Sequence, residues 1–132
     1  MLRSGISVLP GEGSQQYALG LLLLRTQRMD EALNALNSAY RLSPQGPLFG
    51  YVYGVALDST GAASPALNVW KQVAERHPGH RDTLQALASG LYKLGDFEQS
   101  RVVAERLADL LPGRRSVAEL MEHIKAAAQG GG

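Results

Sequence analysis

Apolar positions recur along the chain with a period of 34 residues. Leu19, Tyr53 and Leu87 share one register, and Leu23, Leu57 and Leu91 share another. Small residues keep the same period, and a proline closes each stretch: Gly20, Gly54 and Ala88, then Ala32, Ala66 and Ser100, then Pro44, Pro78 and Pro112. A period of this length, with alternating small and large apolar positions, is typical of a helical repeat array.

Within each period, apolar residues three or four positions apart predict two helices. The predicted helices cover about 14–26, 29–42, 48–60, 63–76, 82–94, 97–110 and 116–129. Turns are predicted at Gln27-Arg28, Gly61 and Gly95, and helix N-caps at Ser64, Asp96 and Ser116. Ser116 and Glu119 have the spacing of a capping box, in which each side chain satisfies a backbone N–H near the helix start.

This periodicity divides the chain into units. Residues 13–46, 47–80 and 81–114 form three helix-turn-helix units, 115–129 form a capping helix, and 130–132 form a flexible tail. Residues 1–12 are interpreted either as the remnant of a preceding repeat or as a leader with coincidental spacing. The remnant interpretation depends on Leu2, Gly5 and Pro10, which lie 34 residues before Leu36, Ala39 and Pro44.

Composition excludes several classes of protein. The 132 residues, 45% hydrophobic and 19% charged, are typical of one ordinary globular domain. A net charge of +1 gives no general attraction to nucleic acid or to anionic membranes. The longest fully apolar run, Leu21–Leu24, is too short to insert into a membrane. We therefore expect a soluble protein, and its lack of cysteine is compatible with either cytoplasm or periplasm.

The repeating positions resemble those of the tetratricopeptide repeat family. The matching residues are Leu19-Gly20, Leu23, Ala32, Leu36, Ala39 and Pro44; Tyr53-Gly54, Leu57, Gly61, Ala66, Trp70, Val73 and Pro78; and Leu87-Ala88, Leu91, Gly95, Ser100, Ala104, Leu107 and Pro112. The resemblance implies an all-α fold, an α-α superhelix (solenoid) of three such units plus the C-terminal capping helix. Arg101 departs from the pattern, because the other units hold Leu33 and Leu67 there.

The resemblance also implies a concave groove lined by the first helix of each unit. The positions facing it are Tyr17, Leu21, Leu24, Tyr51, Val55, Asp58, Gln85, Ser89 and Tyr92. We expect a protein–protein interaction module or scaffold that binds a partner peptide or helix in this groove, apolar and aromatic at its N-terminal end and polar at the other. Two alternatives stay open: a self-assembling, homo-oligomeric scaffold, and an accessory domain of a larger bacterial enzyme or cytochrome.

No motif indicates catalysis or a cofactor. His77-x-x-His80 is the only spacing that suggests a metal site, and no cysteine is present to complete one. Neither a nucleophile motif nor a glycine-rich phosphate loop appears, so we expect no enzyme, no metal, no cofactor and no nucleic acid partner. One subgroup of the family clamps the C-terminal carboxylate of chaperones with cationic side chains. The corresponding positions are Tyr17, Leu21, Val52, Asp82 and Ala86, and none is cationic. We expect no such clamp.

Overall fold

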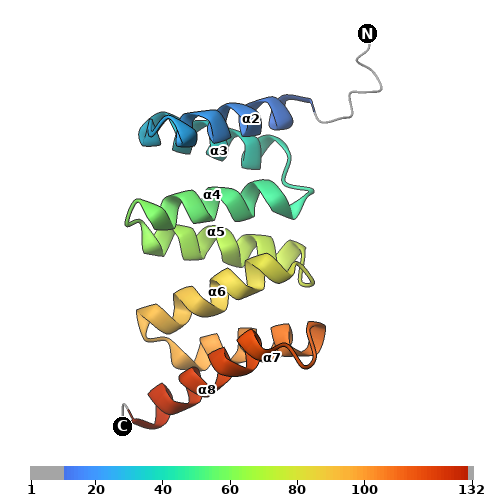
Figure 1. The fold of residues 1–132 in the computed structure, drawn as a ribbon. Helices are drawn as coiled ribbons and strands as arrows, with labels where there is room; N and C mark the ends of the chain where they lie inside the picture. Colours follow the sequence, from blue (N-terminus) through green and yellow to red (C-terminus); the bar gives the residue numbers. More distant parts are fainter. Residues whose placement is uncertain (1–10, 131–132) are drawn as a thin grey trace. The chain divides into compact units, whose positions relative to one another are not determined.

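The computed structural model describes residues 11–130 and is helical throughout that range apart from the connections (Figure 1). The helices are α2 (Gly11–Arg25), α3 (Met29–Leu42), α4 (Pro47–Ser59), α5 (Ala63–Arg76), α6 (Arg81–Leu94), α7 (Phe97–Leu110) and α8 (Arg115–Gly130). The bounds of α3, α5 and α7 are those that the apolar periodicity predicts, and the other four helices differ from the prediction by one to three residues. Residues 1–10, to which Leu2, Gly5 and Pro10 belong, lie outside the described range.

The chain forms two compact units that do not coincide with the predicted repeats. The first ends at Val69 and the second begins at Trp70, so the division falls within α5. The division into three repeats and a capping helix therefore stays a prediction. The predicted tail begins one residue too early, because Gly130 belongs to α8.

In the first compact unit, α2 pairs with α3, and α3 packs against α4. Leu36 and Ala39 of α3 are fully buried. The two paired helices approach closely at Gly20, where an added Cβ would lie 2.6 Å from Cδ2 of Leu36. Gly20 is therefore required as a small residue by the packing of α3, as its position in the period predicts.

In the second compact unit, α6 pairs with α7, and α7 packs against α8. Leu84, Leu91 and Leu107 form the buried apolar centre. Ser100 is fully buried and its hydroxyl donates a 2.7 Å hydrogen bond to the carbonyl of Ala88, twelve residues earlier. This bond satisfies a polar group that would otherwise be costly to bury.

Helix α8 carries the period one step further. Its buried side chains are Val117 and Ile124. Glu122 lies 34 residues after Ala88, in the register of Gly20 and Gly54, and is exposed. A position that is small and buried in all three earlier helices thus holds a large charged residue here.

The turns use the left-handed backbone region that the predicted glycines favour. Gly61 has φ 90° and Gly95 has φ 95°. Gln27, which has their register in the first repeat, has φ 64°. A side chain in this region is strained, so the first turn carries a cost that the other two avoid.

One of the three predicted N-caps is confirmed and two are wrong. Asp96 caps α7, because its carboxylate accepts a 3.2 Å hydrogen bond from the Gln99 N–H. Ser64 and Ser116 lie inside α5 and α8, each of which begins one residue earlier. The carbonyls that accept the first helical bonds belong to Ala62 and Arg114, so the expected capping box does not form there.

Within the described residues, no helix is long and apolar enough to cross a membrane.

Candidate functional site

The first compact unit contains six of the nine residues predicted to line a groove. Tyr17, Leu21 and Leu24 project from α2 at intervals of four and three residues, which puts them on one face of the helix. Tyr51, Val55 and Asp58 have the same spacing on α4. Val55 is 41% exposed, Asp58 is exposed, and the other four are half-buried. Each face thus presents apolar side chains that are partly exposed.

Two of these side chains also pack within the first compact unit, which the sequence did not predict. The ring of Tyr17 stacks on Phe49 of α4, with centroids 4.7 Å apart. Leu24 packs against the buried cluster of Leu23, Ala32 and Ala35. The stack of Tyr17 on Phe49 joins α2 to α4. Leu24 has a structural role as well, so its replacement would disturb the fold.

The second compact unit contains the remaining three residues, all on α6. Gln85, Ser89 and Tyr92 are half-buried. The Gln85 amide donates a 3.4 Å hydrogen bond to the Ser89 hydroxyl, and the Tyr92 ring lies 5.7 Å from that of Phe97. This face is polar, and its side chains already make contacts with one another and with α7. It offers hydrogen-bonding groups rather than apolar anchors.

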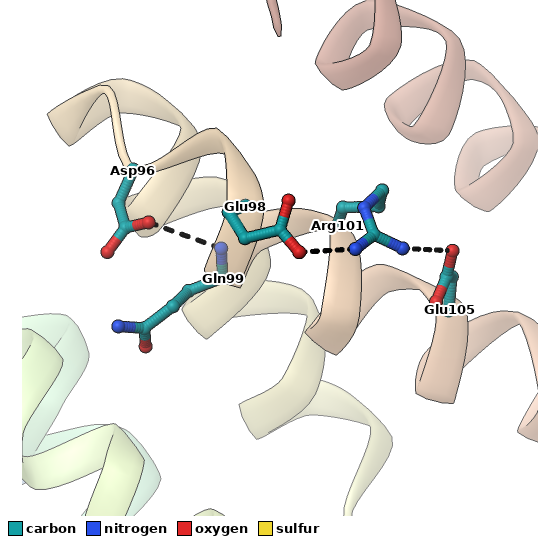
Figure 2. A network of polar contacts seen from close by, with 5 residues as sticks. All are labelled: Asp96, Glu98, Gln99, Arg101 and Glu105. Carbon is teal, nitrogen blue, oxygen red and sulfur yellow. Dashed lines mark hydrogen bonds and ion pairs between the residues drawn. The ribbon is translucent and has the colours of Figure 1, made fainter.

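A second concave surface lies between α7 and α8, with a volume of about 430 Å³. Phe97, Met121 and Ile124 give it apolar walls, and Arg101 stands at its side. Figure 2 shows that Arg101 is held between Glu98 and Glu105 of the same helix; the bond to Glu105 is 2.8 Å long. The hydrogen bonds that the Arg101 guanidinium donates to Glu98 and Glu105 raise its pKa above the ordinary value.

This network explains why an arginine fits where the other repeats hold leucine. The Arg101 side chain is 46% exposed, so its charge remains in water, and both ends of the guanidinium have carboxylate partners. An anionic ligand would have to displace one of these partners. The α7–α8 surface is therefore a poor site for an anion, although the sequence singles out its arginine.

The two histidines that suggested a metal site do different work. Nδ1 of His80 lies 2.6 Å from the Thr83 hydroxyl and accepts a 3.4 Å hydrogen bond from the Thr83 N–H, which makes His80 the N-cap of α6. Nε2 of His77 is buried without a hydrogen-bond partner. Burial lowers the pKa of His80, with smaller contributions from Asp82 (raising) and from His77 and Arg81 (lowering). The sequence did not predict this cap.

Within residues 11–130, no three His, Asp or Glu side chains gather closely enough to hold a metal ion. Of the five positions that correspond to the carboxylate clamp, four carry uncharged side chains. The fifth, Asp82, is exposed at the start of α6. The absence of a clamp stays a prediction.

No family model and no curated protein matches the sequence. Solved structures do. MamA from Desulfovibrio magneticus RS-1 aligns with a TM-score of 0.83 at 20% identity, over 93% of this chain and 70% of that one. The first tetratricopeptide repeat domain of Spaghetti (RPAP3), bound to the HSP90 peptide SRMEEVD, aligns with a TM-score of 0.78 at 14% identity. The alignment covers 89% of this chain and 96% of that one.

A third similar structure is the Yersinia enterocolitica type III secretion chaperone SycD in complex with a peptide of the translocator YopD. It aligns with a TM-score of 0.75 at 15% identity, over 87% of this chain and 93% of that one. The chain therefore has the tetratricopeptide repeat fold, an all-α fold of the α-α solenoid class, as the repeating positions predicted.

Proposed function

We propose that the chain is a protein-interaction module, without catalytic activity of its own, that binds an extended segment or helix of a partner. The contact faces are Tyr17, Leu21 and Leu24 on α2 and Tyr51, Val55 and Asp58 on α4. The observation that carries the proposal is the row of partly exposed apolar side chains on each of these helices, which culminates in Val55. Exposed apolar surface of this kind marks interaction sites.

The comparisons support a peptide as the partner. Among structures of the same fold, that of Spaghetti (RPAP3) holds an HSP90 peptide and that of SycD holds a peptide of YopD. A partner matched to α2 and α4 would carry apolar anchors for the leucine and valine side chains. It would also carry a hydrogen-bond donor or a cation for the exposed carboxylate of Asp58.

Helix α6 supplies a second, polar contact area in this proposal. Gln85 and Ser89 offer an amide and a hydroxyl, and Tyr92 offers a ring with a polar tip. Such groups add selectivity. A partner that covers them without forming hydrogen bonds to them removes their hydrogen bonds to water, and this weakens its binding. The apolar faces on α2 and α4 would then give most of the affinity.

The test is capture of partners from lysate by the tagged chain, followed by affinity measurements on each captured protein. Val55→Glu places a charge on the proposed face without removing buried volume. Leu42→Glu is the matched control, because Leu42 is 48% exposed and lies outside the face. We expect Val55→Glu to weaken binding about tenfold or more, and Leu42→Glu to bind like the unchanged chain.

Leu21→Glu should behave like Val55→Glu, and circular dichroism checks that helix content is kept. Leu24 is avoided because it packs on Leu23, Ala32 and Ala35. Equal binding by all variants would move the site away from α2 and α4. Capture of only the chain itself would favour a self-assembling scaffold. Capture that requires a further part of a larger protein would favour the accessory role.

A further inference from the structure

The two contact faces proposed above lie on α2 and α4, and α3 packs against both of these helices. Phe49 of α4 also reaches α2 directly. Its ring stacks on that of Tyr17, with centroids 4.7 Å apart and the ring planes inclined by 27°. The stack therefore joins the helices of the two faces without passing through α3.

Phe49 lies against α2 at two successive turns. Gly13 and Tyr17 are four residues apart, which puts them on one side of α2. A Cβ added at Gly13 would lie 3.3 Å from Cε2 of Phe49 and 2.1 Å from Oγ of Ser43. The missing side chain at Gly13 thus lets the α2 backbone approach Phe49 closely, and the Tyr17 ring covers Phe49 one turn later.

Phe49 is not itself one of the proposed contact residues. It is half-buried, and Tyr51, the first residue of the α4 face, follows two positions later. Helical residues two positions apart do not share a side, so Phe49 points away from that face. Tyr17 is the first residue of the α2 face, with Leu21 one turn further along the same side. The Phe49 ring therefore touches a contact residue without being one.

The stack is a feature of the first compact unit and not of the repeat as such. Two periods later, the registers of Tyr17 and Phe49 hold Gln85 on α6 and Val117 on α8. These two side chains cannot form an aromatic stack, and Val117 is 2% exposed. The half-buried ring pair thus occurs beside the apolar faces of α2 and α4, whereas the polar face of α6 lacks one.

We propose that Phe49 is a positioning residue of the interaction site: its ring holds Tyr17 in place and so keeps the α2 face at a set distance from the α4 face. The proposal rests on the function proposed above, because it concerns how the two faces act together. A partner segment that contacts Leu21 and Val55 at once then binds without first ordering the two helices. Loss of the stack leaves each face intact but lets their separation vary, which weakens binding.

The separation of the two helices can be measured without a partner. The chain contains no cysteine, so spin labels attach only to introduced ones. Leu22→Cys on α2 and Val55→Cys on α4 use side chains that are 52% and 41% exposed. Pulsed electron paramagnetic resonance then gives the distribution of distances between the labels. Phe49→Leu removes the ring and keeps an apolar side chain, and we expect it to broaden this distribution. Phe49→Tyr keeps the ring and should leave the distribution narrow.

Tyr53→Leu is the matched control. The Tyr53 ring lies 6.3 Å from that of Tyr40, and this pair joins α3 to α4 rather than α2 to α4. Leucine occurs at the same register in α2 and α6, as Leu19 and Leu87, so the packing accepts it there. The variant removes an aromatic ring of α4 within the same compact unit, and the distance distribution should stay narrow.

The same three variants without labels are compared in binding to the protein that the unchanged chain captures in the test above. Phe49→Leu should weaken binding about tenfold, because the two faces no longer keep the separation that the partner segment needs. Phe49→Tyr and Tyr53→Leu should bind like the unchanged chain. Circular dichroism checks helix content, and Phe49→Met replaces Phe49→Leu if that variant loses helix.

A distance distribution that stays narrow in Phe49→Leu would overturn the proposal, and so would equal broadening in Tyr53→Leu. A broader distribution with unchanged affinity would overturn it as well, while the proposed function would stand as long as Val55→Glu weakens binding. Failure of the proposed function has a different signature. In that case Val55→Glu binds like the unchanged chain whatever the distances are, which removes the site that Phe49 is proposed to position.

Discussion

The pair α2–α3 and the pair α6–α7 occupy the same register two periods apart, yet different chemistry holds each together. In α2–α3, Gly20 faces the fully buried Leu36, and the turn passes through a strained Gln27. In α6–α7, Ala88 and Ala104 stand at these positions, a buried serine bonds across the pair, and Gly95 makes the turn. The repeat pattern therefore specifies how large the residue at each position can be and where the chain turns. The interactions that stabilise each helix pair differ.

The largest effects are expected when α2–α3 receives the residues that α6–α7 has at these two positions. Leu36→Ala should lower the free energy of unfolding by about 2–5 kcal/mol, because a fully buried leucine leaves a cavity. Gly20→Ala should cost about 1–3 kcal/mol, because its Cβ would lie 2.6 Å from Leu36 Cδ2. Urea unfolding followed by circular dichroism measures both.

The double variant Gly20→Ala/Leu36→Ala should cost less than the sum of the two single changes, by about 1 kcal/mol or more, because the smaller residue makes room for the added methyl group. Gly79→Ala is the control, since an added Cβ at Gly79 meets no atom within 4 Å. If the two changes in the free energy of unfolding add strictly, the residue sizes at positions 20 and 36 are not coupled.

The next effect concerns the polar bond in α6–α7. Ser100→Ala should lower the free energy of unfolding by about 0.5–1.5 kcal/mol, because the buried hydrogen bond to the Ala88 carbonyl is lost. Thermal or urea unfolding measures this change. A gain in stability would mean that burying the hydroxyl costs more than its bond returns.

The turns allow a reciprocal exchange with a smaller effect. Gln27→Gly should raise the free energy of unfolding by about 0.4–1 kcal/mol by relieving a side chain at φ 64°. Gly95→Ala should lower it by a similar amount, about 1 kcal/mol, because φ 95° strains any side chain. The two substitutions are compared in the same unfolding assay, and changes of the same sign would contradict the assignment of strain to Gln27.

The smallest effect is a dependence on pH through the cap of α6. Burial lowers the pKa of His80 from the ordinary value of 6.5, so the unfolded chain binds the proton more tightly than the folded chain. The stabilising contribution is full above 6.5 and is lost as pH falls from 6.5 through the lowered pKa.

His80→Asn keeps a side-chain acceptor for the Thr83 N–H but does not titrate. The free energy of unfolding is measured between pH 5 and 8. Its increase with pH should be smaller in the variant, because the contribution of His80 is missing. The two proteins differ at this one position, so the difference between the two curves isolates His80. Identical slopes would show that the folded and unfolded pKa values of His80 are equal.

Much of the fold could be predicted from the sequence. The fold was predictable because a shared period and a closing proline fix helix lengths and their order, and α3, α5 and α7 begin and end where the pattern indicates. Caps were less predictable. Ser64 and Ser116 suit an N-cap in isolation, but the carbonyls of Ala62 and Arg114 already begin the helices.

The candidate faces were predictable as rows on α2, α4 and α6, since helical spacing alone decides which residues share a side. What those residues touch was not. Phe49 stacks on Tyr17 although the two are 32 positions apart, and the fit depends on the distance between helices. Arg101 occupies a position that is apolar in the other repeats. Its long side chain reaches water and two carboxylates, which the pattern of apolar positions does not predict.

Glu122 of α8, at the register of Gly20, affects where in the chain a further repeat could be added. A second helix that faced position 122 with a leucine, as α3 faces Gly20 with Leu36, would clash with the glutamate side chain, because Gly20 leaves no space even for a Cβ beside Leu36. Gene duplication that adds a whole 34-residue unit before α8 does not involve this position, whereas pairing a new helix with α8 itself requires either a smaller residue at position 122 or a smaller residue facing it. Evolution can therefore lengthen such an array by insertion more easily than by growth from this helix.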